Sequence, residues 1–84
     1  MGDWFVYMLR CADDTFYTGI TTDVQRRVHE HNHARSAAAY TRARRPVTLV
    51  YQEPSESRSC AARREAAIRK LGRAEKDKMV NGDR

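Results

Sequence analysis

The side chains in this chain that are best able to do chemistry are two phenols, a guanidinium, an imidazole and a carboxylate. Tyr7 and Tyr17 lie ten residues apart, Arg27 and His31 follow within one helical turn of each other, and Glu65 comes much later. Phenol and imidazole groups can move protons, a guanidinium can bind an anion, and a carboxylate can hold a cation. These residues therefore offer proton transfer and ion binding, provided that the fold brings them together.

The two tyrosines lie in segments that are typical of paired β-strands. Residues 4–9 form an apolar run rich in aromatic side chains, residues 16–20 form a second β-prone run, and residues 13–15 between them are typical of a turn. If the opposed residue numbers of this hairpin sum to an even value, Tyr7 and Tyr17 point to the same face. Strand tyrosines also serve as simple core residues, and the glycine in the second run fits either a bulge or close packing.

Capping and breaker residues indicate three helices and one further strand after the hairpin. Thr22, with Gln25 three residues later, is typical of a helix N-terminus, and this helix should extend to about Asn32. Ser57 can cap a second helix that stops at Gly72. The other expected segments are a polar basic stretch over 34–45, a strand over 47–51 with Pro46 at its start and Pro54 beyond its end, and a short helix over 74–80 closed by Asn81-Gly82.

Together these elements predict one small α+β domain over residues 1–84. The order β-β-α-β-α-α gives a sheet of about three strands flanked by helices. A chain of 84 residues has room for one modest core and no second active module. No apolar run approaches the roughly 20 residues that cross a bilayer, and the first residues lack a secretory pattern. We therefore expect a soluble, cytoplasmic protein.

Helical geometry decides which side chains of the first helix face the sheet. At about 100° per residue, Val24, Val28 and His31 share one side, and Arg27 lies beside Val24. A guanidinium on that side is costly unless it is paired or reaches an anion. Arg27 is thus either a paired or snorkelling residue or an anion-binding one. His31 is either a hydrogen-bonded structural residue or a functional one.

Glu65 has an equally informative position in the second helix. It lies at the edge of an apolar stripe, where a carboxylate can face the sheet. Glu65 could pair with a neighbouring arginine. It could also hold a hydrated Mg²⁺, which uses few protein oxygens and keeps waters that substrate phosphates can replace. The stripe consists of Cys60, Ala61, Ala67, Ile68 and Leu71.

Positive charge is concentrated in the second half of the chain. The formal net charge is +5, and residues 1–42 hold equal numbers of basic and acidic side chains. This excess of positive charge favours a polyanionic partner, although solvated helix faces have the same composition. One basic loop with a single aromatic residue is suited to phosphate contacts and base stacking, or else only positions the third strand. Its candidate nucleic-acid-binding residues are Arg35, Tyr40, Arg42, Arg44 and Arg45.

Over nearly its whole length, the chain resembles the GIY-YIG nuclease superfamily. The motifs that carry the resemblance are, in order, Val6-Tyr7, Tyr17-Thr18-Gly19-Ile20, Arg27, His31 and Glu65. Each motif is weak alone, but the ordered set with its spacings is specific. The chain is most similar to small stand-alone bacterial members through the runs 17–23, Arg26-Arg27, Tyr40-Thr41, Arg45-Pro46-Val47 and 64–68.

This resemblance implies a three-stranded antiparallel sheet and metal-dependent hydrolysis of DNA phosphodiester bonds. It implies that Glu65 holds Mg²⁺ or Mn²⁺ and that Arg27 neutralises charge on the phosphoryl group. It further implies that Tyr17 helps to deprotonate the attacking water, with Tyr7 and His31 orienting that water or relaying its proton. The glycine of the second motif corresponds to Gly19, a structural residue next to the site.

Three classes of function follow from these observations. The first is a metal-dependent endonuclease in DNA repair or processing, selective for DNA structure or of low sequence specificity, because the chain has no separate DNA-selecting domain. The second is a nucleic-acid-binding module with the same fold and negligible turnover. The third is an interaction module for a repair protein. We expect the first, because the set of candidate catalytic residues matches the family pattern apart from the lysine that some members carry after the glycine of the second motif, where this chain has Ile20.

Overall fold

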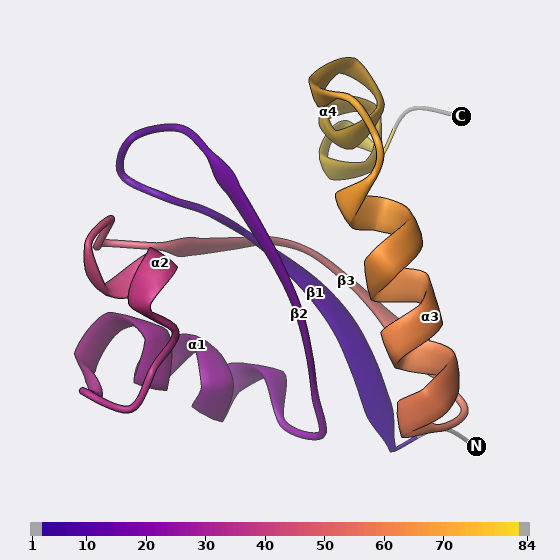
Figure 1. Ribbon diagram of the computed structural model, residues 1–84, viewed down its shortest axis with the longest axis horizontal. Coiled ribbons are helices and arrows are strands. Elements are labelled where there is room, and N and C mark those ends of the chain that lie inside the picture. The colour runs from indigo at the N-terminus through magenta and orange to yellow at the C-terminus, as the bar shows by residue number, and fades with distance from the viewer. Residues whose placement is uncertain (1–2, 83–84) are drawn as a thin grey trace.

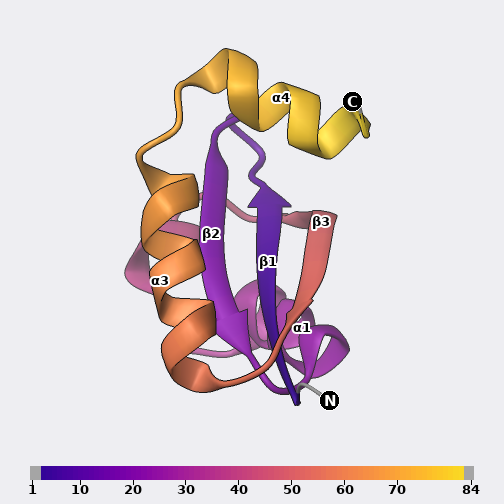
Figure 2. The ribbon, with the colours of Figure 1, turned by 90° about the vertical axis from the view of Figure 1, so that its right-hand side faces the viewer.

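The structure is a computed structural model that describes residues 3–82. Within this range, α1 and α2 lie on one face of a sheet, α3 lies on the other, and α4 crosses one end of the strands (Figures 1 and 2). The elements are, in order, β1 (Trp4–Arg10), β2 (Phe16–Thr21), α1 (Val24–His33), α2 (Ala39–Arg42), β3 (Thr48–Ser55), α3 (Arg58–Arg69) and α4 (Arg73–Asn81).

The sheet is antiparallel, and β1 is its central strand between β2 and β3. This confirms the predicted α+β class with a three-stranded antiparallel sheet. The four residues Val6 to Leu9 of β1 are at most 1% exposed. A central strand that is covered on both faces has an uninterrupted apolar sequence, which explains why residues 4–9 do not alternate with polar residues.

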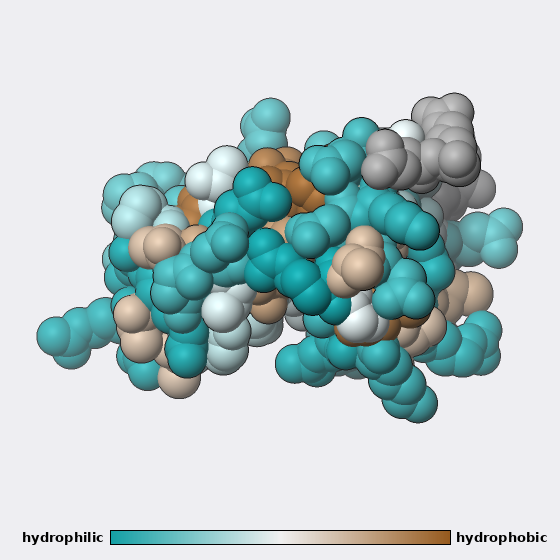
Figure 3. Space-filling view, turned by 90° about the horizontal axis from the view of Figure 1, so that it is seen from above, coloured by the Kyte–Doolittle hydropathy of each residue, from teal (hydrophilic) through white to brown (hydrophobic). Residues whose placement is uncertain are grey.

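Two apolar clusters, one on each side of the sheet, form the core. On the side of α1, Tyr7 and Leu9 pack with Val24. On the side of α3, Met8 packs in a cluster with Ile68. Seen from above, hydrophilic side chains cover most of the surface around a small hydrophobic patch (Figure 3). Among residues 3–82, no helix has the length and apolar character that crossing a membrane requires.

The register between β1 and β2 puts both motif tyrosines on one face. Tyr7 is paired with Gly19, and Leu9 is paired with Tyr17. Residues paired across an antiparallel ladder project to the same side, so Tyr7 and Tyr17 both face α1. The condition set by the sequence, an even sum of opposed residue numbers, is therefore met.

The first helix begins differently from the prediction. Its N-cap is Asp23, whose carboxylate accepts the backbone N–H of Arg26 at 3.0 Å. The prediction of Thr22 as cap, with Gln25 as its partner, was wrong. Both residue types are favourable caps, and here β2 extends to Thr21, whose hydroxyl accepts the Asp23 N–H at 3.1 Å and so fixes the start of the helix.

Two further predictions for the middle of the chain are corrected. The third strand runs over Thr48–Ser55, so Pro54 lies inside it, opposite Phe5, and not beyond its end. A proline is tolerated there because β3 is an edge strand. The basic segment over 34–45 contains the short helix α2, which the sequence did not indicate. The predicted cap Ser57 of α3 and the end of α4 at Gly82 are confirmed.

Arg45 closes the C-terminal end of α1. Its guanidinium donates hydrogen bonds to the backbone carbonyl oxygens of His31, Glu30 and Ala34. The last carbonyls of a helix have no partner within the helix, and a cation near them also interacts favourably with the helix dipole. The structure therefore gives Arg45 a stabilising role at α1, while its predicted contact with nucleic acid stays a prediction.

Replacing Arg45 with glutamine should lower the free energy of unfolding by about 1–3 kcal/mol, because partly buried carbonyls lose charge-assisted hydrogen bonds. Urea unfolding followed by circular dichroism measures this change as a lower midpoint at unchanged slope. Arg35→Gln removes one positive charge from an exposed position nearby and should leave the midpoint close to wild type. Equal midpoints for the two variants would contradict the capping role.

Candidate functional site

The candidate site is organised around the side chain of Tyr7, which lies across the backbone of Gly19. A Cβ atom at position 19 would be 2.5 Å from the phenol oxygen of Tyr7 and 2.7 Å from its Cζ. Such distances are far inside van der Waals contact, so any side chain there would push the ring away. Of the two alternatives for Gly19, the structure shows close packing.

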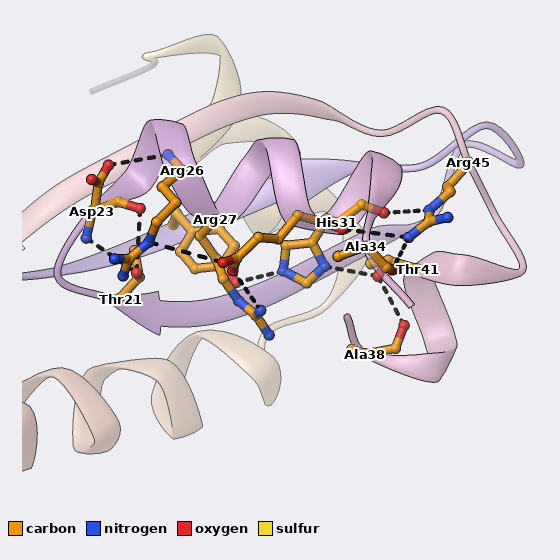
Figure 4. A network of polar contacts seen from close by, with 11 residues as sticks. Thr21, Asp23, Arg26, Arg27, His31, Ala34, Ala38, Thr41 and Arg45 are labelled. Carbon is orange, nitrogen blue, oxygen red and sulfur yellow. Dashed lines mark hydrogen bonds and ion pairs between the residues drawn. The ribbon is translucent and has the colours of Figure 1, made fainter. Parts of the chain in front are cut away.

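His31 connects this phenol to a buried hydrogen-bond chain (Figure 4). The Tyr7 hydroxyl lies 2.7 Å from His31 Nε2, and His31 Nδ1 lies 2.8 Å from the hydroxyl oxygen of Thr41. The Thr41 hydroxyl donates its only hydrogen to the carbonyl oxygen of Ala38 at 3.0 Å. It must therefore accept the hydrogen of Nδ1, which leaves Nε2 free to accept the hydrogen of the Tyr7 phenol.

The protonation states of Tyr7 and His31 agree with this direction. Burial, helped by the positive charge of Arg27, lowers the pKa of His31 to about 4. Burial raises the pKa of Tyr7 to about 12, although Arg27 acts in the opposite direction. At neutral pH the pair therefore holds its proton on the phenol and the imidazole is uncharged. Tyr7 is a hydrogen-bond donor that orients its neighbours, and a poor proton acceptor.

Tyr17 occupies a different environment from Tyr7. Its ring centroid is 5.1 Å from that of His31 in an edge-on arrangement, and 6.0 Å from that of Tyr40. Its side chain is partly exposed and lines a surface pocket. Tyr17 is therefore the phenol that solvent and a substrate can reach.

Arg27 lies on the side of α1 that faces this cluster, as the helical spacing predicted. Its side chain is 28% exposed and forms an ion pair with Glu30 at 3.0 Å. Burial alone would lower the pKa of Arg27, but Glu30 and Tyr7 hold it above its ordinary value. The guanidinium is thus charged and paired, yet still open enough to reach a bound anion.

Glu65 comes to the site from the opposite side of the sheet. Its helix, α3, packs against β2, and its side chain is only 20% exposed. Burial is the main cause of the raised pKa of Tyr7, and the negative charge of Glu65 adds a smaller effect in the same direction. Glu65 also forms an ion pair with Arg69 at 3.4 Å.

A metal site at Glu65 would have at most two ligands from His, Cys, Asp or Glu side chains of the described residues. Within residues 3–82, no group of three or more His, Cys, Asp or Glu side chains is arranged to hold a metal ion. A hydrated Mg²⁺ is commonly bound through one or two carboxylates and completes its coordination with water and substrate oxygens. A partly buried carboxylate at the edge of the sheet fits that mode of binding.

The residues of the basic loop are not all equally available to a ligand. Tyr40 is 37% exposed, and the guanidinium of Arg44 lies 3.8 Å from its ring centroid. Arg44 also pairs with Asp13 at 2.9 Å. Arg35 and Arg42 are exposed, whereas Arg45, as described above, is turned towards the end of α1.

Comparison with known proteins identifies the family to which the chain belongs. The GIY-YIG catalytic domain matches residues 3–78. The chain belongs to the GIY-YIG family. It is therefore a member of a nuclease family whose domains are generally endonucleases and are generally dependent on divalent metals.

Similar proteins and structures agree with this assignment of the GIY-YIG domain. A UPF0213 protein of Desulfotalea psychrophila is 53% identical over 77 residues, which cover 92% of this chain and 70% of that protein. A UPF0213 protein of Staphylococcus haemolyticus is 48% identical over 80 residues, covering 95% and 96% of the two chains. These names state no activity.

Two solution NMR structures have the same fold. The UPF0213 protein of Bacillus halodurans superposes with a TM-score of 0.59 at 39% identity, covering 95% of this chain and 84% of that chain. A protein from E. faecalis superposes with a TM-score of 0.60 at 42% identity, covering 93% and 82%. The sheet and helices of this GIY-YIG domain are thus shared with solved relatives.

One residue of the candidate site was missed by sequence reasoning. Thr41 is fully buried and fixes the tautomer of His31, yet only its place in the run Tyr40-Thr41 drew attention to it. Its contact with His31 spans the connection between α1 and α2, and no periodic pattern in the sequence reports such a contact.

Replacing Thr41 with valine should reverse the hydrogen-bond direction in this chain. Valine has a similar shape but offers no acceptor to Nδ1–H, so the hydrogen should move to Nε2, at a cost of about 1–3 kcal/mol in stability. Nitrogen chemical shifts of the His31 ring in an NMR spectrum distinguish the two tautomers. Thr41→Ser keeps the hydroxyl and should keep the wild-type tautomer. An unchanged tautomer in Thr41→Val would refute the role of Thr41.

The lowered pKa of His31 predicts a loss of stability in mild acid. The unfolded chain takes up a proton near pH 6.5 and the folded chain only near pH 4, so stability should be full above pH 6.5 and fall between these values, by roughly 3 kcal/mol. Urea unfolding over this range measures the slope. His31→Gln should flatten it, and His29→Gln, on the exposed side of α1, should not. An NMR titration of His31 with a midpoint near 6.5 would show the prediction to be wrong.

Proposed function

We propose that this chain is a divalent-metal-dependent endonuclease that hydrolyses DNA phosphodiester bonds, acting in the cytoplasm in DNA repair or processing. The observation that carries the proposal is the position of five groups, of which the first four form one cluster on the α1 side of the sheet and the fifth lies on the helix that packs against β2 from the other side. They are Tyr7 on β1, Tyr17 on β2, Arg27 and His31 on α1, and Glu65 on α3. Cys11 and Cys60 are free, as is common in a reducing compartment.

Glu65 would hold the metal ion, Mg²⁺ or Mn²⁺. When bound, such an ion supplies Lewis-acid stabilisation of charge on the phosphoryl and leaving oxygens. Arg27 would bind the same phosphate from the side of α1 and neutralise the charge that develops there. Its ion pair with Glu30 keeps the guanidinium in place before substrate arrives.

The two tyrosines would have separate roles. Tyr17 is the accessible phenol and would help to deprotonate the attacking water, taking its proton while giving up its own phenolic proton to solvent. Tyr7 is buried and gives its hydrogen to His31, so it would orient the water and the Arg27 guanidinium without losing its proton. Thr41 would act as a positioning residue, because it holds the tautomer of His31 that accepts this hydrogen.

Substrate binding would rely on the basic surface of the same domain. Four residues of this surface lie on α2 or close to it in sequence, near the buried Thr41. They are Arg35, Tyr40, Arg42 and Arg44. Arginine contacts to phosphate carry no base sequence information, so we propose selection by DNA structure with low sequence specificity.

The decisive experiment compares wild type with Glu65→Gln on duplex, flapped, branched and single-stranded DNA in Mg²⁺ and Mn²⁺. We expect wild type to cleave at least one form and the variant to be slower by about a hundredfold or more, because the carboxylate that holds the ion is lost. Glu56→Gln, an exposed carboxylate before α3, is the matched control and should cleave like wild type.

Each result of this comparison has a distinct meaning. Cleavage that survives Glu65→Gln in clean protein would refute the metal site. Salt-sensitive binding without cleavage of any DNA or RNA form would identify the domain as a binding module. Failure of wild type to bind nucleic acid even at low salt would favour an interaction module for another protein.

A further inference from the structure

A small pocket lies directly beside Tyr17 and has no role in the proposed function so far. Its volume is about 180 Å³, and it opens along the free edge of β2. That volume is below the ~300 Å³ at which sites for drug-sized ligands begin, so it suits a single planar group. The residues that line it are Phe16, Tyr17, Thr18, Tyr40, Arg69 and Lys76.

The aromatic walls of this pocket are held in place by neighbouring cations. Arg44 lies over one face of Tyr40, with its guanidinium carbon 3.8 Å from the ring centroid. Arg73 lies 4.3 Å from the ring centroid of Phe16. Cation–π contacts of this kind restrict the motion of exposed rings. Tyr40 is also the most exposed large hydrophobic side chain in the described part of the chain, and a flat ligand can reach it.

The remaining wall of the pocket is cationic and connects to the candidate metal site. Arg69 comes from the last turn of α3, and Lys76 comes from α4. Arg69 is paired with Glu65 at 3.4 Å, so one end of the pocket adjoins the carboxylate that is proposed to hold the metal. The other end adjoins Tyr17, the proposed proton acceptor.

We propose that this pocket binds one unstacked nucleotide of the substrate, next to the bond that is cleaved. The base would stack on the ring of Tyr40, and Arg69 and Lys76 would contact a neighbouring phosphate. The placement of this nucleotide next to the cleaved bond rests on the proposed function, whereas its binding in the pocket does not. A base can enter the pocket only after it leaves the helical stack, so the pocket selects single-stranded or locally opened nucleic acid.

The test measures binding alone, in EDTA, so that no hydrolysis occurs. Fluorescence anisotropy gives the affinity for a short labelled oligothymidylate and for an abasic strand of the same length and charge. The ratio of the two affinities reports base stacking without requiring one fixed register on the strand. The variants are Tyr40→Ala, Tyr40→Phe, Lys76→Ala and Lys78→Ala, of which the last changes an exposed lysine of α4 outside the pocket.

For wild type we expect the base-bearing strand to bind roughly five- to a hundredfold more tightly than the abasic strand, the range that stacking of one base gives. Tyr40→Ala should bring this ratio close to one while leaving the abasic affinity nearly unchanged, and Tyr40→Phe should keep the wild-type ratio. Lys76→Ala should weaken binding of both strands and reduce the salt dependence by about one ion, and Lys78→Ala should do so much less.

The opposite results would overturn the proposal. One is a ratio of base-bearing to abasic affinity that does not change in Tyr40→Ala. The other is an equal loss of affinity in Lys76→Ala and Lys78→Ala. Either result would mean that binding is spread over the basic surface. The outcome is separate from that of the nuclease test. If binding depends on Tyr40 as expected but no DNA is cleaved, the nucleotide pocket is supported and the nuclease function is refuted. If DNA is cleaved but binding does not depend on Tyr40, the nuclease function is supported and the nucleotide pocket is refuted.

Discussion

The close approach of the Tyr7 ring to the backbone of Gly19 is the constraint on which the rest of the site depends. It exists because the β1–β2 register puts these two residues opposite each other. With its ring packed against the glycine, the phenol reaches His31 on α1. A larger residue at position 19 would displace the phenol, and the hydrogen-bond chain to Thr41 would lose its first member.

Burial then separates the two phenols by function. Both project from the same face of the hairpin, but Tyr7 lies in the central strand and is covered on all sides, whereas Tyr17 lies in the edge strand. Removal from water raises the pKa of Tyr7 and lowers that of His31, which keeps both groups neutral, and Thr41 fixes the direction of their hydrogen bond. Support and proton transfer can therefore be assigned to different tyrosines.

The edge position of β2 also explains how helices on opposite faces of one sheet can contribute to the proposed site. α1 carries Arg27 on one face and α3 carries Glu65 on the other. Among the residues that the structure describes, no strand continues the sheet beyond β2, so side chains from the two layers can approach each other around its free edge. Several other arginines have structural partners, such as Arg64 with Glu53 and Arg73 with Asp14. The high positive charge of the chain is therefore only partly available to nucleic acid.

The sequence by itself determined most of the elements, apart from α2, and the residue set of the candidate site. Apolar runs, turn residues and caps such as Ser57 act within a few positions along the chain, and the hairpin, the two principal helices and the family motifs followed from them. The tertiary structure alone decided the register over Gly19, the choice of Asp23 as cap, the passage of β3 through Pro54, and the roles of Thr41 and Arg45. The physical reason is that such contacts depend on how distant segments pack together, and local patterns in a sequence report only the preferences of near neighbours.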